Sequence, residues 1–504
     1  MELSDLIVYD LVGRGSELYP ESLAIIDGER RIRYGEFKTL VDSLATGLKL
    51  RGLSHGDRIA VVAQNSPEFL ALFFASSCIG TTVVPVNTRL TEEEMQFIFQ
   101  DSNPALIFAD DAFQEGLYRI ASTLTGLKGL FSLGKPSHRF QGFDTLLVQS
   151  QASKEMEGSP HDGLAILYTA AIHGRPRGAI LTNGNFIASN LHQMSFLQFS
   201  TKDVNLNLLP FYHIGGLASA LAVFHFGGAN VLMARFEPEK ALDWIEKEKV
   251  SLFTTFPPIL ATLLDCQEKM PANISSLRCV NGIDHPDNIN RLKIKSRAKF
   301  FVGYGQTETT GVVTFGLFDE RPGSAGRPSP LARIKLVDDY DQEVPSDSPG
   351  EIVIRGPLVF KGYWNLEKDT EHTFRGGWHH TGDVGRFDSD GYLWYVKRKA
   401  EKELIKPGGE NVYPAEVEKV ILQFPGVKET VVIGIPHPKW GEGIKAVCVV
   451  EEDFSATEQQ IIDFVGGKIA RYKKPHYVEF VSSLPKDEAG FIDREKVKTI
   501  YGVK

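Results

Sequence analysis

The stretch best suited to bind an anion covers residues 168–178. Its loop carries glycines and basic side chains at His173, Gly174, Arg175, Arg177 and Gly178. The apolar run Leu164–Leu167 predicts a buried strand before the loop, and the pattern over 182–197 predicts a helix after it. In a strand–loop–helix arrangement, backbone N–H groups and a helix N-terminus face a phosphate. The spacing is not that of a Walker A loop, so this stretch alone is weak support for a phosphate site.

Three further stretches, 209–213, 304–308 and 378–383, carry side chains that chemistry can use, and each also has an ordinary structural explanation. A single histidine among apolar residues, such as His213, is most often a hydrogen-bonded core residue. Thr307-Glu308 alone is more typical of a helix start with a capping carboxylate. Asp383 after Thr-Gly is typical of an Asx turn. Their order along the chain, not any one of them, favours a functional interpretation.

In that order the stretches resemble the motifs of the AMP-forming adenylating enzymes, which include acyl-CoA synthetases, luciferases and the adenylation domains of peptide synthetases. The matching residues are Thr169, Gly174, Pro176 and Gly178; Leu209-Pro210 and His213; Tyr304-Gly305-Gln306-Thr307-Glu308; Gly350-Glu351-Ile352 and Gly362-Tyr363-Trp364-Asn365; Thr381-Gly382-Asp383; Gly408-Gly409-Glu410-Asn411; and Trp440-Gly441-Glu442. The resemblance extends to about Arg494 and is strongest to the fatty-acid and aryl-acid CoA ligases.

The resemblance implies a role for each nucleotide-site residue. Asp383, with Arg398 nearby, is expected to accept hydrogen bonds from the ribose hydroxyls. Thr307 is expected to bind the α-phosphate, and Glu308 is expected to hold Mg²⁺, a hard ion that takes oxygen ligands. Catalysis would also use His213, beside the acyl pocket, and Arg177. The other nucleotide-binding residues are expected to be Thr169, Gly174, Gly282, Tyr304, Gly305 and Gln306, with Gly303 lining the acyl pocket.

The family first forms an acyl-adenylate and then rotates a small domain to admit the thiol of coenzyme A. By resemblance, the residues serving this second step are Lys406, Gly408, Gly409, Glu410 and Trp440. The charged run over 397–403 predicts a surface linker, and the hinge is expected near Lys402 and Glu403. The implied reaction converts an acid, ATP and coenzyme A to acyl-CoA, AMP and pyrophosphate. A fatty or aryl acid is the favoured substrate.

Two departures from the family pattern keep other functions open. Ala170, Ala171, Ile172 and His173 replace the hydroxyl-bearing and glycine residues of the family's phosphate loop, and Arg177 replaces a lysine. Phe491 stands where the family has the lysine used in adenylation, and losing such a cation typically costs on the order of 10²–10³ in rate. One alternative is a same-fold enzyme that acts on a preformed acyl-adenylate or acyl-CoA thioester without ATP. Another is a non-catalytic binder of nucleotide or acyl-CoA.

The elements that position these residues predict an α/β fold. A strand over 58–63, a helix over 67–78 and a strand over 82–86 form a βαβ unit, so we expect a parallel sheet with covered faces. Strand and helix patterns continue to alternate as far as Lys299–Val302. Short strands from about residue 333 predict a β-rich subdomain over 330–400. We therefore expect a large adenylate-forming domain over 1–400 and a mobile α+β domain over 401–504.

The amino-acid composition limits the classes of partner and the compartment that we expect. The chain of 504 residues has 55 basic and 64 acidic residues, a net charge of −9, which disfavours nucleic acid as a partner. The four cysteines lack metal-binding or disulfide spacing and are typical of a reducing compartment. The N-terminus has no signal-peptide pattern and no apolar run reaches membrane-span length, so the cytoplasm is expected. The acid and the oligomeric state are left open by the sequence.

Overall fold

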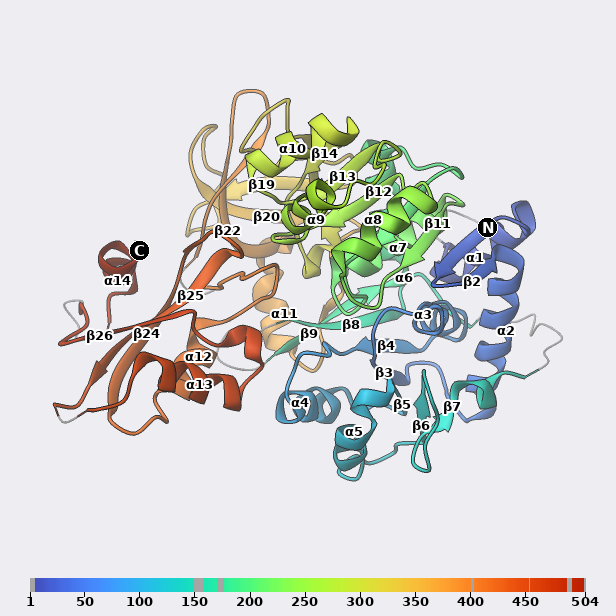
Figure 1. Cartoon of the computed structure of the whole chain (residues 1–504), viewed down its shortest axis with the longest axis horizontal. Coiled ribbons are helices and arrows are strands. Elements are labelled where there is room, and N and C mark those ends of the chain that lie inside the picture. The colour runs from blue at the N-terminus through green and yellow to red at the C-terminus, as the bar shows by residue number, and fades with distance from the viewer. Residues whose placement is uncertain are drawn as a thin grey trace.

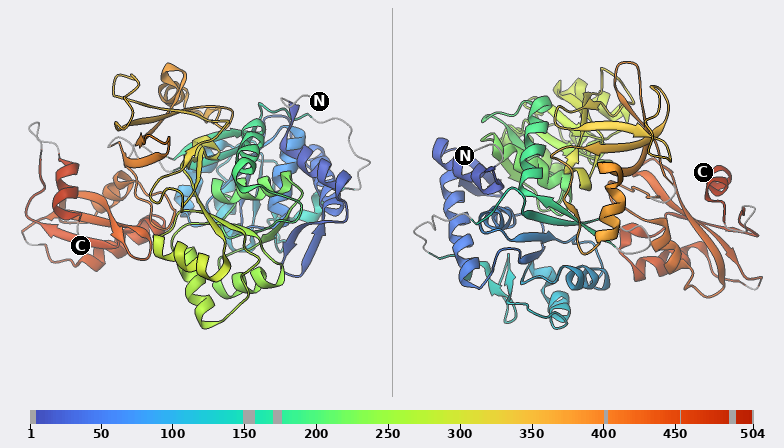
Figure 2. Two further views of the ribbon diagram at one scale, coloured as in Figure 1. Left: turned by 90° about the horizontal axis from the view of Figure 1, so that it is seen from above. Right: turned by 180° about the vertical axis from the view of Figure 1, so that it is seen from behind.

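The chain forms a large N-terminal body and a small C-terminal body that lie side by side in the computed structural model (Figure 1). The structure describes residues 5–148, 157–169, 176–399, 403–452, 454–486 and 492–502. The first and last helices, α1 (Val8–Leu18) and α14 (Arg494–Tyr501), lie at opposite ends of the molecule, and the two views of Figure 2 agree on this. The expected mixed α/β fold with a large and a small part is confirmed.

The first sheet of the large body contains the predicted βαβ unit. In spatial order its strands are β21 (Gly362–Tyr363), β9 (Arg177–Thr182), β8 (Gly163–Thr169), β4 (Thr82–Pro85), β3 (Arg58–Val62), β5 (Leu106–Ala109), β6 (Gly129–Ser132) and β7 (Gln141–Gly142). Strands β3 and β4 pair in parallel, and helix α3 (Pro67–Ile79) connects them. Every residue of β4, and every residue of α3 except Glu68, is buried, because this sheet is covered and its central strands are apolar.

The second sheet carries the other predicted parallel strands. In spatial order they are β18 (Arg327–Pro328), β17 (Thr314–Leu317), β14 (Lys299–Val302), β13 (Cys279–Gly282), β12 (Leu252–Thr255), β10 (Val204–Asn207), β11 (Ala229–Leu232), β1 (Leu23–Asp27) and β2 (Arg30–Arg33). Strands β10 to β14 pair in parallel, so their carboxyl ends meet at one edge, where the loops bearing residues 209–213, 282–284 and 303–308 begin.

Helices and aromatic side chains join the two sheets. The helices of the large body are α1, α2 (Tyr34–Leu50), α3, α4 (Glu92–Ser102), α5 (Gln114–Ala121), α6 (Asn183–Leu197), α7 (Ile214–His225), α8 (Pro238–Lys247), α9 (Ile259–Lys269), α10 (Pro286–Ser296) and α11 (Glu367–Thr373). The rings of Phe37, Phe74 and Phe224 pack together from α2, α3 and α7. Their cluster includes Ile25 of the second sheet and Val61 of the first, so one core serves both sheets.

Three smaller sheets complete the described part of the chain: two are antiparallel, and the sheet of the small body is mixed. The predicted β-rich segment forms β19 (Arg333–Val337), β20 (Gly350–Arg355), β22 (His379–Phe387) and β23 (Leu393–Arg398) in that spatial order, and a short pair joins β15 (Gly305–Gln306) to β16 (Gly311–Val312). The small body contains β24 (Val427–His437), β25 (Gly441–Val450) and β26 (Tyr477–Val481) with α12 (Pro414–Ile421), α13 (Glu458–Lys468) and α14. Arg398 therefore ends a strand, whereas the sequence placed it in a linker.

The strand and the helix predicted before and after the phosphate loop are confirmed as β8 and α6, but a strand that was not predicted lies between the loop and the helix. Residues 177–182 form β9, which pairs antiparallel with β8, so the loop joins two strands of a hairpin. Helix α6 begins only at Asn183, after that strand, and its cap is Thr182. The apolar, β-branched stretch Ala179–Leu181 is buried as a strand between β8 and β21. Loop residues 170–175, including His173 and Gly174, lie outside the described part of the chain.

A small-body lysine joins the two bodies. The Lys473 ammonium lies 2.5 Å from Glu94 of α4 in the large body and 2.7 Å from Glu416 of α12 in the small body. Lys473 is buried, and the nearby ring of Tyr472 packs under the guanidinium of Arg89 at 4.8 Å. Because a buried carboxylate is costly without a partner, the single ammonium fixes this docked arrangement.

The first turn of α7 has no room for a side chain at Gly216. A Cβ there would lie 2.4 Å from the Pro210 carbonyl oxygen and 2.5 Å from that of Leu209. We expect Gly216→Ala to destabilise the large body by about 1–3 kcal/mol, because the clash is with backbone. Gly13→Ala in α1, where the nearest atom is a flexible Lys38 carbon at 3.9 Å, is the matched control and should be neutral or stabilising. Calorimetric unfolding of both variants tests this, and equal midpoints would contradict it.

Candidate active site

A cavity of about 420 Å³ lies between the loops of the second sheet and the small body. The sequence-predicted residues that line it are Thr169, Arg177, His213, Gly282, Gly303, Gly305, Gln306, Thr307, Glu308, Arg398, Lys406, Gly409 and Trp440. They come from both sheets, from β23 and from the small body. Most of the predicted site residues, which are far apart in sequence, therefore share one cavity.

Asp383 is buried behind the cavity wall in a hydrogen-bonded network. Its Oδ2 accepts from the Tyr304 hydroxyl at 2.7 Å and from the Gln306 amide at 2.6 Å, and its Oδ1 lies 2.7 Å from Nε of Arg398. Burial would lower the pKa of Arg398, but the Asp383 charge outweighs it and raises that pKa. Neither Asp383 nor Tyr304 is among the described residues lining the cavity, so the predicted ribose and adenine contacts stay predictions.

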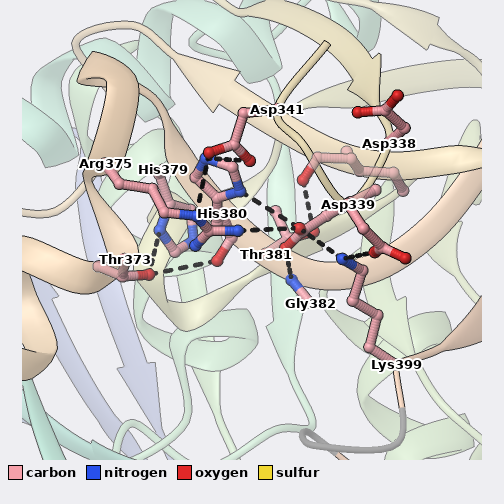
Figure 3. Close-up of polar contacts among 12 residues, drawn as sticks. Asp338, Asp339, Asp341, Thr373, Arg375, His379, His380, Thr381, Gly382 and Lys399 are labelled. Carbon is pink, nitrogen blue, oxygen red and sulfur yellow. Dashed lines mark hydrogen bonds and ion pairs between the residues drawn. The ribbon is translucent and has the colours of Figure 1, made fainter. Parts of the chain in front are cut away.

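A second acidic cluster supports the turn that carries Asp383 (Figure 3). Its centre is Glu351 of β20, which accepts from the Gly382 N–H at 2.9 Å and faces His380 and Lys399 at 3.2 and 3.1 Å. Lys399 also pairs with Asp339, and its N–H donates to the Gly382 carbonyl. The cluster therefore ties the end of β23 to the turn at Gly382.

The phosphate side of the cavity is built around Glu308. Its Oε1 accepts from the Tyr363 hydroxyl at 2.9 Å, and the Arg177 guanidinium packs over the Tyr363 ring at 4.2 Å. Burial would lower the pKa of Arg177, but Tyr363 and the Glu308 carboxylate raise it, so a fixed cation stands beside Glu308. Thr169 ends β8 and its hydroxyl lies 3.4 Å from the Arg177 carbonyl. Tyr363 was missed as a site residue, although it lies in a matched motif.

The loop at Gly282 could not carry a larger residue. Gly282 has φ +142°, and a Cβ there would lie 1.9 Å from the Thr255 carbonyl oxygen. Asp284, unusual at its position in the family pattern, accepts hydrogen bonds from the His285 N–H and the Asn288 amide. Its side chain therefore holds the turn that leads into α10, whose N-cap is His285, and does not line the cavity in the described structure.

Glu410 of the small body is buried against the large body. Its Oε1 lies 2.8 Å from Arg89, and its Oε2 lies 3.2 Å from the Asn87 amide and 3.3 Å from Nε2 of His213. Burial would raise the pKa of Glu410, but His213 and Arg89 lower it to about 2. His213, directly before the first residue of α7, is thus held to the small body. The sequence could not indicate this contact.

Three small-body residues close the cavity. Gly408 has φ +60°, and its N–H donates to the Trp440 carbonyl, while Gly409 lies against Phe256 of the large body. The Lys406 side chain lines the cavity, so its surface is accessible although protein surrounds it. That enclosure, and then the charge of Arg398, lowers the pKa of Lys406 to about 8. The Lys406 N–H donates to the Glu442 carboxylate at 2.6 Å.

The hinge and the lysine-replacing position fall partly outside the described residues. Lys402 and Phe491 are both outside them. Glu403 is described and pairs with Arg494 and Lys498 inside the small body. The residues flanking 487–491 belong to the small body: Lys486 pairs with Glu429, and Ile492 packs in the cluster under β24.

The described residues form neither a metal-binding cluster nor a helix that could cross a membrane. No group of three or more His, Cys, Asp or Glu side chains there is arranged to hold a metal ion. Among the described helices, none combines the length and apolar character that crossing a bilayer demands. Glu308 is a single carboxylate whose Oε2 has no partner in the described part of the chain, which suits Mg²⁺ because that ion takes one or two carboxylates plus substrate phosphates.

The Glu351 cluster predicts a pH dependence. Burial would raise the pKa of Glu351, but His380, Lys399 and the Gly382 N–H lower it from 4.5 to about 2. The carboxylate therefore stabilises the fold above about pH 4.5, and that contribution is lost as the pH falls towards 2. Glu351→Gln should lower the melting temperature most at pH 7 and progressively less below pH 4.5. Exposed Glu371→Gln is the control, and a constant difference from wild type at all pH values would contradict this.

Comparisons with known proteins identify the family. The AMP-binding enzyme family matches residues 14–364, and the AMP-binding enzyme C-terminal domain matches residues 416–490. The chain is 31% identical to the indoleacetate–CoA ligase of Aromatoleum aromaticum, over 100% of this chain and 99% of that protein. It superposes with TM-score 0.84 and 28% identity on a double mutant of the o-succinylbenzoate CoA synthetase of Bacillus subtilis bound to a product analogue, covering 98% of both chains.

A third relative differs in its ligand. ATP-bound MatB of Rhodopseudomonas palustris is 29% identical to this chain and superposes with TM-score 0.71, over 99% of both chains. The family matches cover both the large and the small body, and the resemblance drawn from the sequence motifs is confirmed. The chain belongs to the AMP-binding enzymes, the adenylating family that includes the acyl-CoA ligases.

Proposed function

We propose that this protein is an acid–CoA ligase that activates a carboxylic acid as its acyl-adenylate and transfers the acyl group to coenzyme A. The observation that carries this is the single cavity in which Arg177, Glu308 and Arg398 of the large body meet Lys406 and Trp440 of the small body. Relatives similar over their whole length are named as CoA ligases.

In the first step, a carboxylate oxygen of the acid attacks the α-phosphorus of ATP, and the bond to the β-phosphate breaks to release pyrophosphate. Negative charge gathers on the phosphoryl oxygens, so fixed cations facing the cavity stabilise the transition state. Arg177 supplies such a cation beside Glu308. Mg²⁺ held by Glu308 would neutralise phosphate charge. Thr307 lies next to Glu308 on the cavity wall, and we propose that its hydroxyl donates to the α-phosphate.

In the second step, the sulfur of coenzyme A attacks the acyl carbonyl carbon, the carbon–oxygen bond to AMP breaks, and the thiol proton is lost. In this structure the small body places the Gly408–Glu410 loop and Trp440 at the cavity, and this arrangement suits the second step. We further propose that Lys402 and Glu403 form the hinge and that the two domains divide near residue 400. We also propose that the protein is cytoplasmic, because its cysteines are free thiols.

A second function has one observation in its favour. Phe491 and Ala170–His173 alter the residues that would serve ATP, whereas those serving acyl transfer remain. A same-fold enzyme acting on a preformed acyl-adenylate would keep the second step alone. The experiment below separates the two functions.

Acid-dependent pyrophosphate release from Mg-ATP tests the first step. We expect release by the wild type with at least one acid of a panel of short, long and aryl acids, and faster release by Phe491→Lys, because a preorganised cation at that position is worth on the order of 10²–10³ in rate. Both proteins should transfer preformed acyl-AMP to coenzyme A equally fast. Wild type that releases no pyrophosphate, yet transfers preformed acyl-AMP, would establish the second function instead.

Substitution of Lys406 tests whether the docked arrangement of the two bodies serves the second step. Lys406→Met should slow transfer from preformed acyl-AMP to coenzyme A at least about tenfold, with a smaller effect on pyrophosphate release, because a cation facing the departing AMP is lost. Lys439→Met, which removes a neighbouring exposed cation over the Trp440 ring, is the control and should change neither rate. Equal slowing of both steps by Lys406→Met would contradict the assignment.

A further inference from the structure

One end of the cavity is neutral and polar. Its described apolar lining comes from Ala218, Val312 and Phe315, and its polar lining comes from Gln193, Ser219, Thr254 and Asn281. The charged residues of the cavity contact one another or Asp383, Tyr363 and Glu410, as described above. No ion pair or hydrogen bond recorded among the described residues joins the four polar side chains to a charged group. The cavity therefore has a charged phosphate end and an uncharged end.

Strand register creates the polar surface. Thr254 of β12 and Asn281 of β13 are partners in the parallel ladder, so their side chains lie on the same face of the sheet. Thr254 Oγ1 lies 3.2 Å from Asn281 Oδ1 and 2.8 Å from the Ser219 hydroxyl of α7. Ser219 also bonds the Gly215 carbonyl. All three side chains are less than a tenth exposed, so this is a built site and not a solvated surface.

Counting protons shows which group is left for a ligand. Ser219 and Thr254 each have one hydroxyl proton, and the protein acceptors Gly215 O, Ser219 Oγ and Asn281 Oδ1 can use both. The Asn281 amide has two N–H donors, and neither has a partner among the described residues. Asn281 lines the cavity, and its amide nitrogen is not among the fully buried unpaired atoms, so it stays accessible from the cavity. A ligand that fills this end without offering an acceptor would bury these N–H groups unpaired, which is costly.

Gln193 of α6 adds a second, loosely held amide. It is 5% exposed, and its Nε2 reaches Ser189 Oγ and the Ala218 carbonyl only at 3.5 Å, the limit for a hydrogen bond. Its Oε1 has no recorded partner within the described part of the chain. A ligand hydroxyl can accept from the Asn281 amide or donate to the Gln193 carbonyl oxygen, so it matches the unpaired group of either side chain.

We infer that the acid activated here carries a neutral hydrogen-bonding substituent, a hydroxyl above all, on a compact apolar body, with that substituent at Asn281 and Gln193. This rests on the proposed ligase function. A plain alkyl acid would leave both amides unpaired. A dicarboxylate would place a second charge where the described lining offers no cation. The apolar lining of Phe315 and Val312 suits a ring between the two ends.

The experiment compares matched acids: phenylacetic, 3- and 4-hydroxyphenylacetic, 4-carboxyphenylacetic and octanoic acids. The ratio of kcat/KM for acyl-CoA formation, hydroxyl acid over its deoxy analogue, should be at least about tenfold, because a site built to bind a hydroxyl discriminates strongly against its absence. Asn281→Leu and Gln193→Leu keep the side-chain size and should bring that ratio close to one. Val312→Ala is the control: it changes cavity shape for both acids and should leave the ratio unchanged.

Calorimetric titration of the same acids into each protein separates this inference from the proposed function. If no acid is turned over, the ligase function fails, and tighter binding of a hydroxyl acid, lost in Asn281→Leu, would still support the polar site. Equal affinities and equal kcat/KM values for hydroxyl and deoxy acids would overturn the inference. So would a preference for octanoic or 4-carboxyphenylacetic acid, or a hydroxyl preference that survives both leucine variants. Melting temperatures show that each variant is folded.

Discussion

The buried carboxylate of Asp383 is the constraint on which the rest of the site depends. A buried charge needs a partner and hydrogen bonds, and here Arg398 of β23 and the stretch holding Tyr304 and Gln306 supply them. These bonds fix the end of β14, the short strand β15 and the last residue of β23 relative to one another. The segments that lead to Thr307 and Glu308 and to the small body therefore start from the same carboxylate.

Glu351 in turn holds the turn that precedes Asp383. It binds the Gly382 N–H directly and faces Lys399, whose own N–H bonds the Gly382 carbonyl. The turn before Asp383 is thus held on both of its polar backbone groups. Since Lys399 is the last described residue before 403, the same cluster anchors the large-body side of the connection between the two bodies.

Two charged side chains of the small body, Glu410 and Lys473, are buried in the docked arrangement. Glu410 meets Arg89, Asn87 and His213, and Lys473 meets Glu94. Each pair joins the two bodies, so undocking would expose the Glu410 and Lys473 charges to water, where they need no partner. Ion pairs of this kind specify one docked geometry without a large apolar interface, which suits a body that must leave and return during a two-step reaction.

By itself the sequence determined the α/β class, the βαβ unit around α3, the antiparallel segment over 333–398 and the family, because strand and helix periodicity and ordered motifs are local signals. It also pointed to most of the residues that share the cavity. It misplaced residues 177–182, because β8 and β21 pair with that segment only in the folded chain and turn it into a strand. The tertiary structure alone decided that Glu410 reaches His213 and that Tyr363 supports Glu308. It alone placed Asn281 beside Thr254 and Ser219, because such contacts depend on strand register and docking between distant segments, which no local pattern encodes.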